Sequence, residues 1–172
     1  MITITLPYPI SANRYWRTRV IKPKAGAPIV STYISPEAKE FKADVERIVR
    51  AAGVREPITG RVAIAYTLFP NRPQDFRTRM RKLGDAWHDT VQCIDLDNAQ
   101  KVLLDALKGI AFLDDVWVRR ITAERAEPDE HGARLVVTIT QIGTPQPQVA
   151  LDLDRPTESR SVAPSLFDPL EV

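Results

Sequence analysis

The sequence predicts an α+β domain in which a single mixed β-sheet is packed by two helices. Two observations lead to this prediction: short β-rich segments alternate with amphipathic segments of helical periodicity, and the elements follow in the order β-α-β-α-β-β. The 172 residues, 44% of them hydrophobic and 27% charged, are enough for one small domain and some additional chain. We predict a folded domain at 1–142 and a flexible, disordered, proline-rich acidic tail at 143–172.

The first predicted elements are a strand and a basic loop. Residues 2–6 alternate isoleucine and threonine and are followed by Pro7, a pattern typical of a short strand. Residues 13–24 carry five arginine or lysine side chains and no acidic one, and we expect them to form a loop. Tyr15 and Trp16 within it are as compatible with packing as with stacking on nucleic-acid bases.

A helix and a buried strand follow this loop. Ser35 is expected to cap the helix and Pro36 to occupy its first position, and apolar residues then recur every three or four positions until Gly53. Residues 61–69, R-V-A-I-A-Y-T-L-F, are rich in β-forming residues and lie between a glycine and a proline. This pattern predicts a strand that is largely buried.

The second half is predicted to contain a long loop, a helix and two strands. Residues 70–94 show no periodicity, and loops of this length are usually functional or disordered. An apolar stripe at helical spacing predicts an amphipathic helix that follows Asn98 and ends near Gly109. Strands are expected at 116–125 and 133–142, joined by the polar turn E-P-D-E-H-G.

Composition and charge narrow the class of protein. Cys93 is the only cysteine, which excludes an internal disulfide framework and suits a reducing cytoplasm. No apolar run approaches the roughly 18 residues of a membrane span, and no signal peptide is readable, so we expect a soluble cytoplasmic protein. Five acidic and two basic side chains give the tail a charge of −3, so the +2 of the whole chain leaves +5 on residues 1–142. This balance suits a polyanionic partner.

The candidate chemistry lies around the second helix. Asp95 and Asp97 stand just before it, Lys101 lies one turn into it, and the pair Asp114 and Asp115 follows its end. Residues two apart in extended chain point the same way, so the first two carboxylates can converge on one point. Crowded carboxylates stay ionised when a hard cation such as Mg²⁺ or Mn²⁺ lies between them. The third carboxylate reaches that cation only if the following strand runs beside the segment that bears the first two.

These groups match what phosphodiester hydrolysis requires. Bound Mg²⁺ can activate water and neutralise charge on the scissile phosphate. Lys101 can hold a phosphate oxygen or simply pair with Asp97 one turn before it. A simpler interpretation stays open, in which the aspartates are only a helix cap and a solvated turn. The basic segments at 14–24 and 72–82 can likewise be ordinary surface, although acidic groups flanked by basic segments are what a metal-dependent nuclease needs.

Four segments carry a resemblance to a known family. They are L-P-Y-P-I-S-A-N-R-Y-W-R near the start, D-L-D-N-A-Q-K-V-L-L-D-A-L in the middle, F-L-D-D-V-W-V after it, and R-L-V-V-T-I-T in the last predicted strand. Together they resemble the RusA family of Holliday junction resolvases, small phage and prophage endonucleases, over roughly residues 1–142. The resemblance implies a homodimer that uses Mg²⁺ or Mn²⁺ and makes paired symmetric nicks in four-way DNA junctions during recombination and repair.

The resemblance also assigns residues. It places the metal-binding and catalytic aspartates at Asp95, Asp97 and Asp115, and the essential lysine at Lys101. A four-way junction has two-fold symmetry, and a two-fold dimer offers one active centre to each of two equivalent strands. Eight residues are expected to contact DNA: Asn13, Arg14, Arg17, Arg19, Arg72, Arg77, Arg79 and Asn98.

Three features depart from the family pattern. Ile94 stands where the family has a basic residue or a proline, which removes a potential positive contact. Residues 71–93 resemble an insertion relative to the shortest members and can alter the grip on a junction. The tail lies outside the resemblance, and its Q-V-A-L-D-L segment resembles the peptide with which bacterial replication proteins dock on the sliding clamp, although chance is the alternative explanation. The clamp-binding residues in it are Gln148, Leu151 and Leu153.

The sequence therefore predicts a Mg²⁺-dependent, structure-selective endonuclease that resolves Holliday junctions. A nuclease for flaps or replication forks is the alternative in the same class. A non-catalytic adaptor for DNA or the sliding clamp, whose aspartates are only caps, is the alternative in another class. Metal binding by the wild type and its loss in an Asp97 variant distinguish an enzyme from an adaptor.

Overall fold

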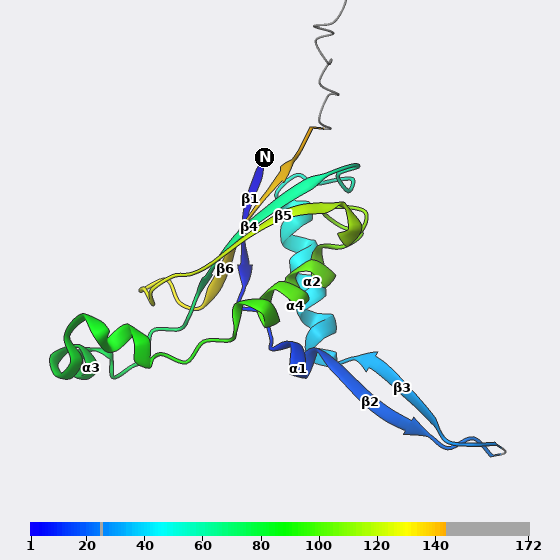
Figure 1. Cartoon of the computed structure of the whole chain (residues 1–172), viewed down its shortest axis with the longest axis horizontal. Coiled ribbons are helices and arrows are strands. Elements are labelled where there is room, and N and C mark those ends of the chain that lie inside the picture. The colour runs from blue at the N-terminus through cyan, green and yellow to red at the C-terminus, as the bar shows by residue number, and fades with distance from the viewer. Residues whose placement is uncertain (25, 144–172) are drawn as a thin grey trace, which may run out of the picture.

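The main sheet combines parallel and antiparallel strands, as the α+β prediction requires. The structure is a computed structural model that describes residues 1–24 and 26–143. Four strands lie in the order β1-β6-β4-β5, with β4 and β5 parallel and the other neighbours antiparallel (Figure 1). The α+β class and the single mixed sheet of the core are thereby confirmed. The four strands are β1 (Ile2–Pro7), β4 (Val62–Phe69), β5 (Val118–Arg125) and β6 (Arg134–Gln141).

Strand β4 lies inside the sheet, between β6 and β5. Its V-A-I-A-Y-T-L-F sequence is rich in residues that favour extended backbone, and side chains two apart point to the same face. That face is buried, because Val62, Ile64, Tyr66 and Leu68 are each at most 2% exposed. The neighbouring β6 buries alternate residues in the same core.

Two helices pack against this buried face, and Figure 1 shows both on the same side of the sheet. Helix α2 (Pro36–Ala51) begins where the sequence predicts, since Ser35 Oγ accepts a hydrogen bond from the Ala38 amide at 3.1 Å. Helix α4 (Leu96–Leu107) buries an apolar stripe at helical spacing, and each fully buried leucine in it contributes about 1.5–3 kcal/mol to stability. The stripe consists of Ala99, Val102, Leu103, Ala106 and Leu107.

Two segments for which the sequence predicts loops are regular structure instead. The basic segment lies in α1 (Ala12–Tyr15) and β2 (Trp16–Ile21), and β2 pairs with β3 (Ile29–Ile34) in an antiparallel hairpin, which we call the arm. The segment 70–94 contains α3 (Phe76–Leu83) and the 3₁₀ helix η1 (Gly84–Thr90), which together we call the lobe. The arm and the lobe point to opposite sides of the molecule (Figure 1).

The loop predictions are wrong for a physical reason. Hydrophobic periodicity reports an element that buries one face, and neither β2 nor α3 buries one. All six residues of β2 are exposed, and none of the eight residues of α3, all of them described, is buried. Their sequences therefore lack the apolar stripe that identifies α2 and α4.

The remaining differences from the sequence prediction are small. Strand β5 begins at Val118 rather than 116, because Asp115–Trp117 form a short 3₁₀ helix, η2. The described part of the chain has no helix that is both long and apolar enough to cross a membrane. The predicted tail lies outside the described residues from 144 onward, and so does the predicted clamp peptide with Gln148, Leu151 and Leu153.

Candidate functional site

The start of α4 presents two aspartates to solvent. The helix begins at Leu96, earlier than predicted, so Asp95 occupies the N-cap position and Asp97 lies in the first turn rather than in extended chain; both are exposed. Within the described residues, the Asp95 side chain caps none of the free amides of this helix. Its Oδ2 instead accepts a hydrogen bond from Asn98 Nδ2 at 3.3 Å. The interpretation of Asp95 as a helix cap therefore finds no support in its contacts.

Asp97 and Lys101 form a loose ion pair. Their Oδ2 and Nζ atoms lie 3.5 Å apart, and the two side chains are 68% and 59% exposed. An exposed pair of this kind, one helical turn apart, contributes little to stability and exchanges readily with water. Both side chains therefore remain accessible to a cation or a phosphate.

Two tyrosines anchor the segment that carries these aspartates. The Tyr66 hydroxyl donates a hydrogen bond to the Leu96 carbonyl at 2.7 Å, and the Tyr8 hydroxyl accepts one from the Ile94 amide at 3.0 Å. Burial, together with the negative charge of Asp97, raises the pKa of Tyr66 to about 12. Both phenols therefore stay protonated near neutral pH, since burial also raises the pKa of Tyr8 to about 12.

Sequence reasoning missed both anchors. Tyr8 belongs to the L-P-Y-P motif, which is the one available signal, whereas Tyr66 is indistinguishable in sequence from other core residues of its strand.

The opposite end of α4 carries the second acidic pair. Lys108 Nζ lies 2.8 Å from Asp114 Oδ2 and 3.2 Å from Asp115 Oδ1. The Val116 amide also donates to Asp114 at 3.1 Å. Contact with Asp115, together with the Lys108 and Val116 hydrogen bonds, lowers the pKa of Asp114, and the hydrogen bonds from Lys108 to both carboxylates raise the pKa of the lysine. This end is a closed ion cluster.

The three predicted metal ligands do not meet within one chain. No group of three His, Cys, Asp or Glu side chains among the described residues is arranged to hold a metal ion. Lys108, the partner of Asp115, stands eleven residues after Asp97, which is about 16 Å at 1.5 Å per residue of helix. The expectation that Asp115 folds back onto the first two aspartates is therefore wrong for the single chain.

Chain direction explains this separation. The connection between α4 and β5 is short, so the strand returns antiparallel to the helix and its first residues stay beside the last helical turn. Tyr66, which contacts Leu96 at the start of α4, is paired with Ala123 near the far end of β5. Strand β5 does run beside α4, but its first residues lie at the end of the helix opposite to Asp95 and Asp97.

A hollow of about 250 Å³ lies along the exposed side of α4. Asp105, which lines it, accepts a hydrogen bond from the buried Tyr15 hydroxyl, and this bond ties the root of the arm to the middle of the helix. Trp16 packs on Tyr15 with ring centroids 4.5 Å apart and faces the hollow. The hollow therefore links the arm, the middle of α4 and one of the predicted metal ligands. Its lining residues are Trp16, Lys101, Leu104, Asp105, Lys108 and Asp115.

The predicted DNA-binding residues near the arm differ in the contacts that their side chains make within the chain. Arg17 Nη2 donates to both carboxylate oxygens of Glu37, at 3.0 and 3.3 Å, and Arg14 lies 3.9 Å from the same side chain. Arg19 stacks over the Tyr33 ring at 5.3 Å. Asn13 is exposed beside them. Glu37 therefore offsets part of the positive charge at the root of the arm, whereas Arg19 lies farther out.

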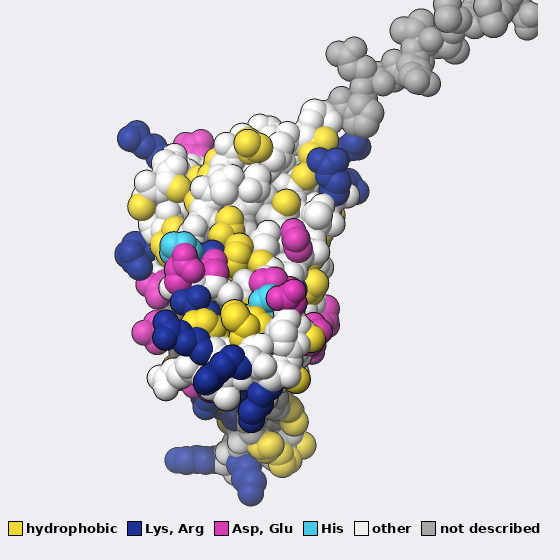
Figure 2. All heavy atoms as spheres, turned by 90° about the vertical axis from the view of Figure 1, so that its left-hand side faces the viewer, with side chains coloured by type: hydrophobic (Ala, Val, Ile, Leu, Met, Phe, Trp, Pro, Cys, Tyr) yellow, Lys and Arg dark blue, Asp and Glu magenta, His cyan; other side chains and the backbone are white. Residues whose placement is uncertain are grey.

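The lobe also contains predicted DNA contacts. Arg79 holds the lobe together, since it bonds Asp75 at 2.9 Å and both the carbonyl and the hydroxyl of Thr90 at 3.0 Å. Arg77 is exposed. Figure 2, which views the molecule from the side of the lobe, shows Lys and Arg side chains gathered low on this face, with acidic and histidine side chains above them. Of the predicted lobe contacts, Arg77 is the one most accessible to a DNA backbone.

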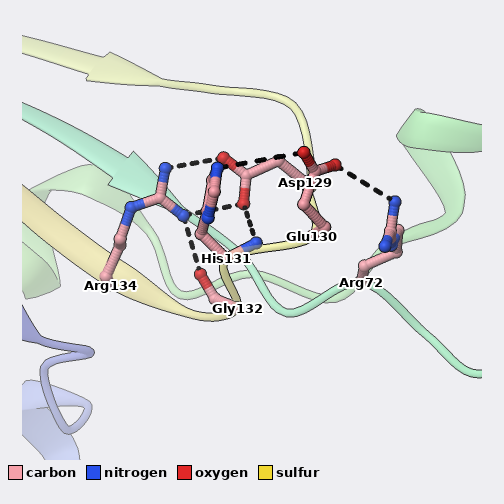
Figure 3. Close-up of polar contacts among 6 residues, drawn as sticks. All are labelled: Arg72, Asp129, Glu130, His131, Gly132 and Arg134. Atoms are coloured by element: carbon pink, nitrogen blue, oxygen red, sulfur yellow. Dashed lines mark hydrogen bonds and ion pairs between the residues drawn. The ribbon is translucent and has the colours of Figure 1, made fainter.

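Arg72 connects the lobe to the turn between β5 and β6. Its guanidinium lies 3.7 Å from Glu130 and stacks over the Phe76 ring at 4.5 Å. Arg134 braces the same turn through two hydrogen bonds to Asp129, of 2.6 and 2.7 Å, which lower the pKa of that carboxyl to about 2 (Figure 3). The geometry indicates a positioning role for Arg72 in addition to its predicted contact with DNA.

Known proteins are similar to this chain over most of its length. Residues 7–140 match the family described as Endodeoxyribonuclease RusA. The chain is 32% identical over 146 residues to proteins named crossover junction endodeoxyribonuclease RusA from Shigella sonnei (strain Ss046) and Escherichia coli (strain K12), and each alignment covers 82% of this chain and 95% of the relative. A protein of the same name from Enterobacteria phage 82 is 32% identical over 145 residues, which are 81% of this chain and 94% of that protein.

Proposed function

Because the chain belongs to the RusA family of endodeoxyribonucleases, we propose that it is a Mg²⁺-dependent, structure-selective endonuclease that resolves Holliday junctions by paired symmetric nicks. The observation that carries this proposal is the exposed pair Asp95 and Asp97 with Lys101 one turn away, held on a segment that one buried and one half-buried tyrosine fix. The names of the relatives, which are crossover junction endonucleases, support the same substrate.

The donor set at the start of α4 suits a hard cation. Two carboxylates and the amide oxygen of Asn98 are the oxygen ligands that Mg²⁺ and Mn²⁺ prefer. A bound ion supplies an acidified water and neutralises charge on the scissile phosphate. Lys101 then holds a phosphate oxygen, while the Tyr66 hydrogen bond keeps the aspartate segment in place. One chain provides two of the three carboxylates, so the full site needs a second copy.

A homodimer with antiparallel α4 helices supplies the missing ligand. Its two-fold axis passes beside the exposed face of α4 near residue 103, so that each helix start faces the end of the partner's helix. The partner's Asp115 then stands next to Asp95 and Asp97, and two equivalent composite sites result.

The charge pattern of α4 favours this pairing. Along its exposed side the helix presents Asp97, Lys101, Asp105 and Lys108, so charges alternate at intervals of three or four residues. In an antiparallel pair Asp97 faces the partner's Lys108, and Lys101 faces the partner's Asp105. Lys101 and Asp105 thereby meet as opposite charges at two symmetric places, which favours this orientation over the parallel one, while the two carboxylates around Lys108 leave the composite site negative and suited to a cation.

Mixing two inactive variants tests the composite site. Asp97→Asn and Asp115→Asn each disable both sites of their own homodimer. A mixed dimer is made by coexpressing the two variants with different affinity tags. In this dimer one composite site contains both substitutions and the other contains neither. We therefore expect the mixed protein to nick labelled four-way junctions in Mg²⁺. If the two variants pair at random, half of the dimers are mixed and each has one intact site, so about a quarter of the wild-type number of active sites is expected. Inactivity of the purified mixed dimer contradicts a site shared between copies.

The same assay tests the reaction itself. Wild-type protein is incubated with a four-way junction, a flap and a fork, each with and without Mg²⁺. Faster cleavage of the junction, dependent on Mg²⁺ and symmetric across it, is the expected result. Preference for the flap or the fork assigns the alternative nuclease activity. Binding to DNA without cleavage, and without a Mg²⁺ site by calorimetry, assigns the adaptor function.

A further inference from the structure

The arm has two chemically different faces. In the antiparallel register Trp16 pairs with Ile34, Thr18 with Thr32 and Val20 with Val30, and cross-strand partners point to the same side. These three pairs form one face, which carries no ionisable side chain. The intervening pairs form the other face: Arg17 with Tyr33, Arg19 with Ser31 and Ile21 with Ile29. The stacking of Arg19 on Tyr33 occurs on this second face.

The uncharged face is open to solvent and carries no cationic side chain for a DNA phosphate. Val20 is 59% exposed, Val30 67% and Trp16 41%. Contacts to a DNA backbone come from cationic and hydrogen-bonding side chains, which the opposite face provides through Arg17 and Arg19. Valines side by side on an exposed two-stranded sheet are typical of a protein interface.

This face leads into the hollow along α4. Trp16 belongs to the uncharged face and also lines the hollow, together with Asp115. Close to Asp115 lies a second group of exposed apolar side chains, on η2 and the residue before the acidic pair. In this group Leu113 is 48% exposed, Val116 63% and Trp117 37%. Two uncovered apolar surfaces thus flank the same hollow, in which the predicted ligand set is incomplete.

We propose that the arm is a dimerisation element whose uncharged face packs against the η2 segment of a second copy of this chain, while its basic face remains available to DNA. The inference rests on the proposed homodimer and specifies its contacts. The two surfaces differ, so a two-fold axis uses each of them twice: the arm of one copy covers η2 of the partner, and the partner's arm covers η2 of the first. The complementary charges along α4 and the apolar surfaces on either side of it then lie in one and the same dimer interface.

Two matched double variants test the proposal in the full-length chain. Val20→Asp with Val30→Asp places two carboxylates on the uncharged face, and Ile21→Asp with Ile29→Asp places the same charges on the next cross-strand pair, which points the opposite way. All four residues lie outside the core, so both variants keep the wild-type far-ultraviolet circular dichroism spectrum and melting temperature. We expect the first to weaken dimerisation by about 100-fold or more in sedimentation equilibrium, because an interface buries unpaired carboxylates at high cost. The second stays dimeric and binds junction DNA less tightly.

Hydrogen exchange identifies what covers the uncharged face. In the wild type, amides of the arm and of η2 become more protected as the protein concentration rises through the dimerisation range. Protection that does not change with concentration assigns the cover to the same chain and overturns the proposal, as does a Val20→Asp, Val30→Asp variant that remains fully dimeric. These failures are separable from that of the nuclease: a dimer that the variant dissociates but that cleaves no junction refutes only the proposed activity.

Discussion

The two ends of α4 carry the same types of group in opposite states. At its start, Asp97 and Lys101 form one long, exposed ion pair, and the Asp95 side chain accepts a hydrogen bond from the neighbouring Asn98 amide. Just beyond its end, Lys108 is shared between two carboxylates at 2.8 and 3.2 Å. The first end keeps its charges available, whereas at the second end the charged groups are engaged with one another. The comparison suggests that the first end binds ligand and that the second supplies a carboxylate after its ion cluster opens.

The largest expected effect comes from the open end. Replacing Asp97 with Asn removes the charge of one proposed metal ligand, and we expect junction cleavage to fall by about 1,000-fold or more. Junction affinity in a gel-shift assay stays the same or tightens, because one charge that repels phosphate is lost. Asp44→Asn, which removes a half-exposed carboxylate from α2, serves as the control and keeps full activity. Full activity in Asp97→Asn refutes the site.

Lys101 gives the next largest effect. Replacing it with Met preserves the aliphatic stem but removes the charge proposed to hold a phosphate oxygen, so we expect kcat to fall by about 100-fold. Mg²⁺ affinity measured by calorimetry stays equal or rises, since a cation beside the metal site has gone. Lys39→Met on α2 controls for the loss of an exposed lysine. If calorimetry shows that Mg²⁺ affinity also collapses, the lysine supports the metal site rather than the phosphate.

The tyrosine anchor has a moderate effect. Tyr66→Phe leaves the Leu96 carbonyl without its 2.7 Å hydrogen bond, at a cost of about 1 kcal/mol in the free energy of unfolding measured by urea denaturation. Because this bond positions the aspartate segment, we expect Mn²⁺ affinity to fall by about tenfold. A variant that loses stability but binds Mn²⁺ as well as the wild type shows that the bond is only structural.

The closed end gives the smallest effect, and it depends on pH. The lowered pKa of Asp114 means that this carboxyl stabilises the fold above its ordinary pKa of about 3.9, and that the stabilisation is lost as the pH falls toward the folded value. The Lys108→Met substitution removes one of the contacts that lower this pKa, and with it part of the stabilisation. The difference in melting temperature between wild type and variant is therefore expected to be small at pH 7 and to shrink below about pH 4. A difference that grows on acidification contradicts the ion cluster.

Elements that bury an apolar face were predictable from the sequence. Helix α2 follows from its Ser-Pro start and its apolar spacing, and β4 from eight residues that favour extended backbone. The arm and the lobe were not predictable, because β2 and α3 are exposed and leave no periodic signal. Candidate ligands could be found as residue types around α4, but the sequence carries no information on the distance between Asp97 and Asp115.

The sequence by itself determined the mixed sheet with its two covering helices, the family, and the residue types around α4. These follow from local periodicity, capping and motif order, which are properties of neighbouring residues. Only the tertiary structure decided that Asp115 stays at the far end of α4, that Tyr66 in β4 and Tyr8 just after β1 hold the aspartate segment, and that the arm has an uncharged face. Each of these depends on chain direction and strand register, which bring residues far apart in sequence into contact or keep them separate.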